Sequence, residues 1–136
     1  MTAQIPETIE FENKKQMLLT CPLEDYFTLG KVDSPFNANC SALWRGYIGH
    51  WKIINGRLYL ISVEPQFDEE NTTVLGDIFP GFDNCVFAHW YSGELRIASG
   101  KEVEFAHAGF GSVYAREVFL SVEEGVLVST RVAHHK

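Results

Sequence analysis

The sequence contains no long apolar run and little cysteine. No stretch approaches the roughly 20 apolar residues that a membrane-spanning helix needs. No apolar run follows a basic start in the opening residues, MTAQIPETIEFENKKQ, so they do not resemble a secretory signal peptide. Cys21, Cys40 and Cys85 are widely spaced and odd in number, which favours free thiols over a disulfide framework. These absences predict a protein of the cytoplasm that makes no membrane contact.

Basic residues are missing from one long stretch. Between Leu58 and Leu95 there is no Lys or Arg, although the stretch holds seven acids: Glu64, Asp68, Glu69, Glu70, Asp77, Asp83 and Glu94. The acids elsewhere are equal in number to the 11 basic residues of the whole chain, so this acidic segment (residues 58–95) carries the entire net charge of −7. Nucleic acid is therefore excluded as a direct ligand, because phosphate binding needs the opposite sign.

The composition of the acidic segment has two interpretations. A solvated face that keeps the protein soluble would also be rich in acids. A calcium loop is not indicated, because DEENTTVLGD lacks the alternating oxygen ligands of an EF-hand. Seven acids without one base exceed what solubility requires, which favours a basic protein partner. The candidate contacts with that partner are Asp68, Glu69, Glu70, Asp77 and Asp83.

Helix-forming patterns are few, and turn signals separate short β-prone runs along the chain. A length of 136 residues is that of one domain, and 46% of apolar residues is enough for a core. The pattern predicts a single all-β domain over residues 1–136, an antiparallel β-sandwich or barrel built from successive hairpins with at most one or two short helices. PLEDYFTLG is a short helix candidate, with Pro22 near its start and Gly30 past its end, whereas NTTVLGDIF is ambiguous.

The strongest turn signal is Asn55-Gly56, which favours a two-residue type I′ hairpin because both turn residues need positive φ. The hairpin has one apolar face and one mixed face, with Val63 on the mixed one. Its predicted register pairs Ile53 with Leu58, Trp51 with Leu60 and Gly49 with Ser62.

Three further hairpins are predicted. A short one turns around residues 13–15. A second turns at Ser92-Gly93 and pairs Trp90 with Leu95, Ala88 with Ile97 and His89 with Arg96. A third has a three-residue turn, Glu123-Glu124-Gly125, and pairs Val122 with Val126 and Leu120 with Val128. This last register is preferred because it groups the apolar residues best.

Motifs of phosphate binding and nucleophilic catalysis are absent from AHAGFGSVYARE, residues 106–117, which contains the densest set of reactive residue types. GFGS lacks the third glycine of a dinucleotide loop and the Gly-Lys-Ser/Thr of a P-loop, and Ser112 has no Gly-x-Ser-x-Gly context. Gly109 and Gly111 instead predict a bulge or corner between two strands. Because bulges often redirect side chains toward a site, a ligand pocket is the alternative, with candidate residues Trp44, Arg45, His107, Tyr114 and Arg116.

Histidines could converge from three predicted strands, since His50, His89 and His107 each lie on a different one. No pair of them has the spacing of a zinc site. We therefore expect no metal and no cofactor, and the sequence gives no positive indication of an enzyme.

Two stretches, ALWRGYIGHWKIINGRLYL and FAHWYSGELRIASGKEVEFAHAGFGSVYARE, resemble a group of small bacterial β-rich proteins. Some proteins of this group look like immunity proteins of polymorphic toxin systems. Together with the acidic segment, the resemblance implies a cytoplasmic binding protein that neutralises a basic secreted toxin by occluding its active site. The alternatives are a small-ligand-binding barrel or enzyme with a pocket near His107, Tyr114 and Arg116, and a structural subunit of a larger assembly.

Overall fold

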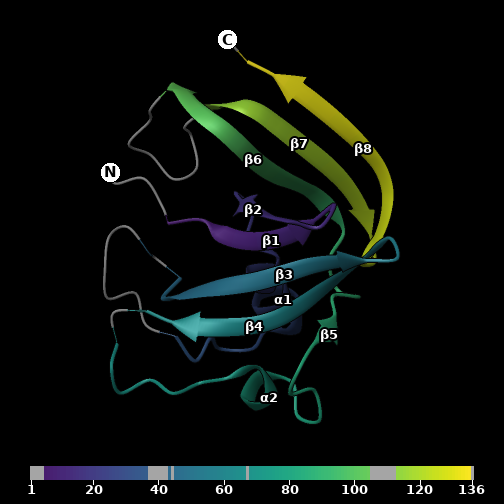
Figure 1. The fold of residues 1–136 in the computed structure, drawn as a ribbon. Helices are drawn as coiled ribbons and strands as arrows, with labels where there is room; N and C mark the ends of the chain where they lie inside the picture. The colour runs from purple at the N-terminus through teal and green to yellow at the C-terminus, as the bar shows by residue number, and fades with distance from the viewer. Residues whose placement is uncertain (1–4, 37–42, 44, 67, 105–112, 136) are drawn as a thin grey trace.

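Strands dominate the structure, a computed structural model that describes residues 5–36, 43, 45–66, 68–104 and 113–135 (Figure 1). The elements are β1 (Glu7–Phe11), β2 (Lys14–Leu18), α1 (Pro22–Gly30), β3 (Tyr47–Ile54), β4 (Arg57–Pro65), α2 (Leu75–Ile78), β5 (Val86–Phe87), β6 (Gly93–Glu104), β7 (Val113–Glu123) and β8 (Val126–His134). The predicted all-β class with short helices is confirmed. Neither helix in the described ranges is long and apolar enough to cross a membrane.

Seven strands form one closed barrel, in the order β3-β1-β2-β6-β7-β8-β4, with β4 pairing back to β3. The pair β1–β3 is parallel, unlike the other pairings, and β2 and α1 lie between these two strands in the sequence. Closure between β8 and β4 is narrow: Arg57 pairs with Val126, and Leu127 N donates to Gly56 O at 2.8 Å. The structure thus adopts the barrel rather than the sandwich.

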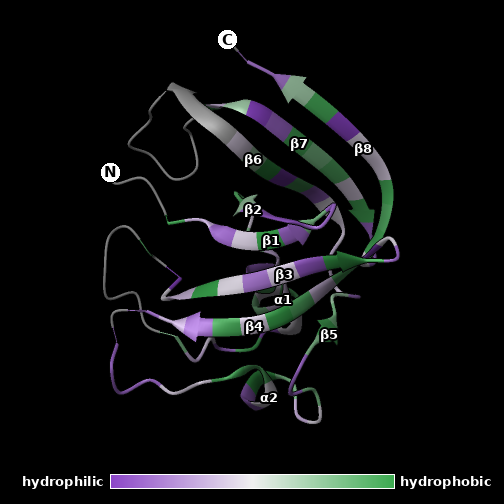
Figure 2. Ribbon diagram, in the orientation of Figure 1, coloured by the Kyte–Doolittle hydropathy of each residue, from purple (hydrophilic) through white to green (hydrophobic). Residues whose placement is uncertain are grey.

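The core fills the barrel interior and extends under α1. Apolar and polar residues are interleaved along β3 and β4 (Figure 2), as expected for strands with one buried face. From α1, Leu23 and Phe27 join the same core, and Trp90 Nε1 donates to Pro22 O at 2.8 Å. The fully buried strand residues include Ile9, Leu18, Tyr47, Leu58, Leu60, Leu95, Ile97 and Leu120.

The β3–β4 hairpin confirms the Asn55-Gly56 turn, whose residues have φ of 52° and 74°. Next to the turn, the pairs Ile53–Leu58 and Trp51–Leu60 are as predicted. A bulge between His50 and Trp51 then shifts the register, so Gly49 pairs with Val63 and not with Ser62. Because a one-residue shift exchanges the two faces of a strand, Val63 is buried instead of lying on the mixed face.

The predicted hairpin at Ser92-Gly93 is wrong. β5 pairs with β4, whereas β6 pairs with β2 and β7, so Trp90–Leu95, Ala88–Ile97 and His89–Arg96 are not cross-strand pairs. The backbone leaves the strand after β5 in a turn in which Tyr91 N donates to Ala88 O at 3.1 Å. Gly125 N donates in turn to Tyr91 O at 2.9 Å. A residue distant in sequence therefore helps to determine the course of the backbone between β5 and β6.

The β7–β8 hairpin exists, but its predicted register is wrong. The turn has two residues, Glu124 and Gly125, with φ of 47° and 82°. Glu123 therefore pairs with Val126, Val122 with Leu127 and Leu120 with Thr130. The predicted register was preferred because it grouped apolar residues. That criterion does not apply to β8, because its Val126, Val128 and Val132 are exposed.

Smaller features differ by one or two residues. The first hairpin turns at Glu12 and Asn13, both at positive φ, rather than around residues 13–15. α1 matches its predicted range, but Gly30 belongs to the helix, and Lys31 takes the left-handed capping position with φ of 52°. The ambiguous run NTTVLGDIF contains α2. The predicted corner at Gly109 and Gly111 lies outside the described residues, between β6 and β7, which pair with each other.

A buried ion pair joins the first strand to the segment before β3. The Glu7 side chain is fully buried and that of Arg45 is 5% exposed, with 2.8 Å between Arg45 Nη2 and Glu7 Oε2. The same carboxylate accepts from Gly49 N at 2.6 Å and Trp51 Nε1 at 3.2 Å. A Cβ at Gly49 would lie 2.5 Å from Glu7 Oε1, so this close approach requires glycine.

Burial raises the pKa of the Glu7 carboxyl, and the Arg45 guanidinium opposes that rise most strongly. The N–H groups of Gly49 and Trp51 act in the same direction as Arg45. Arg45 also donates to Ile5 O at 2.8 Å, so its guanidinium is used within the fold.

Replacing Gly56 with Val should reduce the free energy of unfolding by about 1 kcal/mol or more, because a β-branched residue resists positive φ. No atom lies within 4 Å of a Cβ built at Gly56, so the cost is conformational and not steric. Gly56→Asn is the matched control, because Asn tolerates the left-handed region and should cost less. Urea unfolding measures all three proteins, and equal stabilities for the Val and Asn variants would contradict this account.

Replacing Arg45 with Met should destabilise the protein by about 3–5 kcal/mol near neutral pH, the usual cost of leaving a buried charge unpaired. Loss of the guanidinium should raise the pKa of Glu7 further above its unfolded value. A carboxyl with a raised folded pKa stabilises the fold below its unfolded pKa, and this contribution is lost as the pH rises through the folded pKa. The loss caused by the substitution should therefore be smaller in mildly acidic than in alkaline buffer.

The measurement is urea unfolding as a function of pH. Arg131→Met is the control, because it removes a surface pair with Glu94 at 3.6 Å that should contribute less than about 1 kcal/mol. If Arg45→Met does not fold, the double variant Glu7→Gln/Arg45→Met should recover the fold by removing the buried charge. A pH-independent loss for Arg45→Met would show that the effect is packing alone.

Candidate functional site

The acidic segment extends from β4 to the start of β6 and carries α2 and β5, below β4 in Figure 1. Four of its acids are exposed around α2: Glu69, Glu70, Asp77 and Asp83. Asp68 is half-buried at the start of the same loop. The structure therefore places all five sequence-predicted contact residues on the connection between β4 and β5.

The acids around α2 have few basic neighbours. Within the described ranges, no ion pair joins Glu69, Glu70, Asp77 or Asp83 to a basic residue. Asp77 accepts from Val74 N at 2.9 Å and so caps the short helix. Near the two ends of the segment, Glu64 lies 3.5 Å from His50 Nε2 and Glu94 lies 3.6 Å from Arg131.

Two apolar side chains are exposed among these acids. Val74, at the start of α2, is 57% exposed, and Phe82, after it, is 51% exposed. Apolar anchors within a charged surface are typical of protein interfaces. Sequence reasoning missed both residues, although a phenylalanine between the turn residues Gly81 and Asp83 was a signal for an exposed ring.

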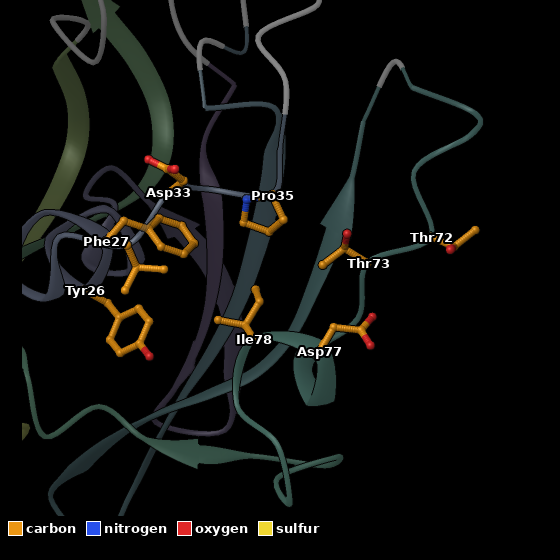
Figure 3. Close-up of a pocket in the computed structure, with 9 residues that line it drawn as sticks. Tyr26, Phe27, Asp33, Pro35, Thr72, Thr73, Asp77 and Ile78 are labelled. Carbon is orange, nitrogen blue, oxygen red and sulfur yellow. The ribbon is translucent and has the colours of Figure 1, made fainter.

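A pocket of about 300 Å³ lies between α1 and the loop that leads to α2 (Figure 3). Its lining residues are Tyr26, Phe27, Val32, Asp33, Pro35, Thr72, Thr73, Asp77 and Ile78. In Figure 3, the two aromatic rings lie on one side, Pro35 and Ile78 lie in the middle, and the two threonines and Asp77 lie on the other side. The acidic segment thus forms one wall of this pocket.

Hydrogen bonds and ring contacts hold the two walls together. Asn71 Nδ2 donates to Pro35 O at 3.0 Å, which ties the acidic segment to the chain after α1. The Asn71 Oδ1 atom accepts from Thr73 N at 3.0 Å and from its hydroxyl at 2.6 Å. On the other wall, the Tyr26 ring packs 4.7 Å from Phe79 and 5.1 Å from Trp90 between ring centroids.

Charge in this pocket is of one sign. Asp33 and Asp77 are its ionisable carboxylates, and no Lys, Arg or His is among its lining residues. In Figure 3, Asp33 lies on the side of the two aromatic rings, and Asp77 lies on the other side of Pro35 and Ile78. The arrangement offers an apolar interior with carboxylates at its borders, which suits a side chain that combines an apolar stem with a positive head.

The second candidate pocket is described only in part. Trp44 and His107 lie outside the described residues. Tyr114 and Arg116 lie two positions apart on β7, opposite Glu102 and Ser99 of β6. Arg45 is buried against Glu7 and is therefore not a free ligand contact.

The three histidines differ in their surroundings. His50 Nδ1 lies 2.7 Å from Thr8 Oγ1, while His107 lies outside the described residues. His89 is exposed, and its ring stands nearly perpendicular to that of Trp90. In the part of the chain that the structure describes, no three His, Cys, Asp or Glu side chains gather as they would around a metal ion.

The chain of contacts Thr8–His50–Glu64 was not predicted, and it lines a hollow of about 710 Å³ on the outer face of the barrel. A hydroxyl beside an imidazole is the beginning of a nucleophilic site. Here the contact follows from the parallel pairing of β1 with β3, which sets Thr8 directly opposite His50. The network is thus accounted for as ordinary cross-strand packing.

Thiol chemistry is suppressed at Cys21. Burial raises the pKa of Cys21 to about 12, with a further rise from the nearby Glu7 carboxylate. Cys21 therefore stays a thiol near neutral pH. Cys85 is a free and exposed thiol, and Cys40 lies outside the described residues.

Comparison with known proteins returned no match among protein families, curated proteins or solved structures.

Proposed function

We propose that this protein is a cytoplasmic binding protein that captures a basic protein partner through the acidic segment. The observation that carries the proposal is the group of exposed acids around α2, which have no basic counterpart among the described residues. The exposed Val74 and Phe82 support the proposal because a protein interface needs apolar contact area as well as charge.

The proposed partner is a secreted bacterial toxin, which makes this chain an immunity protein. Toxins that act on nucleic acids or nucleotides need cationic clefts for phosphate, and an acidic protein surface is complementary to such a cleft. Occlusion of the cleft blocks the toxin without any chemistry by the inhibitor. This mechanism is consistent with the capped, compact loop of the acidic segment, which presents carboxylates on a prebuilt surface.

Charge in this mechanism acts mainly on the rate of association. Exposed carboxylates attract a cationic partner over a distance set by the Debye length, about 8 Å at physiological ionic strength. They contribute little to the stability of the fold, because exposed charges are well solvated. Substitution of these acids should therefore separate binding from folding.

Converting Asp68, Glu69 and Glu70 to their amides should leave the fold intact and slow capture of the partner. The reduction in association rate should be largest at low salt and should vanish as salt screens the charges. The measurement is a series of association rates against ionic strength, with the isolated basic domain of the toxin as the partner. The same variant should protect cells less well against expression of that domain.

The matched control is Glu12→Gln/Glu123→Gln/Glu124→Gln, which removes three exposed acids outside the acidic segment. This control variant changes the net charge by the same amount as the triple amide. A difference between the two variants therefore reports where the charge is removed and not how much charge is removed. Salt-independent curves that coincide for all three proteins would reduce the acidic segment to a solubility feature. Absence of both binding and protection would refute the immunity function.

A further inference from the structure

We propose that the pocket between α1 and α2 receives an arginine side chain of the basic partner. This inference rests on the proposed function, because it names the group by which the partner is anchored once charge has brought it to the acidic segment.

The shape of the pocket suits a long side chain with an apolar stem. Its volume of about 300 Å³ is sufficient for one large side chain but not for a folded segment of the partner. Val32, Pro35 and Ile78 offer aliphatic contact to methylene groups, and the Tyr26 and Phe27 rings lie beside them (Figure 3). Arg and Lys are the side chains that bury methylenes while keeping a charged head near water.

The charge of the pocket selects a cation over a neutral apolar group. Asp33 and Asp77 lie on opposite sides of the apolar interior, and a neutral occupant would take water from them without replacing its hydrogen bonds. Lys31 is the nearest base along the chain before Asp33, and it is not among the lining residues. A guanidinium can donate two parallel hydrogen bonds to a single carboxylate and stacks on aromatic faces, which favours Arg over Lys.

The walls of the pocket are fixed before binding. Asn71 bridges the acidic segment to Pro35 O, and Tyr26 is held by ring contacts with Phe79 and Trp90. A site that is already ordered loses little conformational entropy on binding, which raises affinity for a single anchoring side chain.

The pocket is tested with three capped tripeptides that share one length: Ac-Gly-Arg-Gly-NH2, the same peptide with citrulline, and the same peptide with norleucine. Each is titrated into the whole protein while the methyl resonances of Ile78 and the ring resonances of Tyr26 are followed by NMR. The arginine peptide should shift these resonances and should bind at least roughly tenfold more tightly than the citrulline peptide, in which a urea oxygen replaces one guanidinium nitrogen and removes the positive charge. Asp33→Asn should remove most of this preference.

The control for the pocket is the Asp68, Glu69 and Glu70 triple amide, whose residues do not line it. It should bind the arginine peptide nearly as the unmodified protein does, although it captures the full partner more slowly. Asp33→Asn should instead speed dissociation of the full partner with little change in association rate. These two readouts separate anchoring from attraction.

Failure of the inference and failure of the proposed function give different results. Equal affinity for arginine and citrulline peptides, or no shift at Ile78 and Tyr26, would overturn the arginine pocket while leaving salt-dependent capture intact. Binding of the arginine peptide with no effect of Asp33→Asn on the full partner would also overturn it, because the pocket would then serve a free guanidinium compound. An association rate with the partner that depends neither on salt nor on the triple amide substitution would overturn the proposed function itself.

Discussion

The fold depends on the way in which one buried carboxylate is satisfied. Glu7 lies on the first strand, fully removed from water, and receives hydrogen bonds from Arg45, Gly49 and Trp51. A charge in that position is tolerated only when its partner and its donors are all in place. Arg45 precedes β3, and Gly49 and Trp51 belong to it, so the same set of contacts fixes the parallel pairing of β1 with β3 and the closure of the barrel.

This interaction lies beside the bulge in the β3–β4 pairing, where Ile61 of β4 has no partner on β3. The N–H of Gly49 points at the Glu7 carboxylate, and the absence of a side chain lets the carboxylate approach. The register shift between His50 and Trp51 sits next to this contact, and it turns Val63 of β4 into the core. An apparently local irregularity of the hairpin is therefore coupled to a residue more than forty positions away.

Local sequence signals predicted the parts of the fold that local energetics determine. Asn55-Gly56 specifies a turn by backbone conformation alone, and α1 begins at a proline that fits its first turn. The hairpin predicted at Ser92-Gly93 is wrong because Tyr91 and Gly125 share a hydrogen bond. These two residues are far apart in sequence, and no residue near either of them indicates the contact. The predicted β7–β8 register is wrong because the prediction assumed that the valines of β8 are buried, whereas they are exposed in the barrel. In the same way, the sequence made Arg45 a candidate pocket residue, because nothing near it in sequence indicates its buried partner, Glu7.

The candidate site shows the same division. Counting charges along the sequence was sufficient to locate the acidic segment, because the absence of basic residues can be read directly from the sequence. The pocket could not be located in this way, because its walls come from residues 26–35 and 72–78, which are separated in sequence and are brought together by the fold. In the proposed function, these two parts of the surface have different physical tasks. Exposed acids act at long range and are only weakly coupled to stability, so they can be dense without endangering the fold. A pocket acts at contact distance and benefits from rigidity: here Asn71 links the two walls through Pro35 O, and the Tyr26 ring packs on Phe79 of the core. In this proposal, substitutions can change attraction and anchoring independently of each other. Neither kind of substitution involves the buried Glu7 carboxylate that holds the barrel closed.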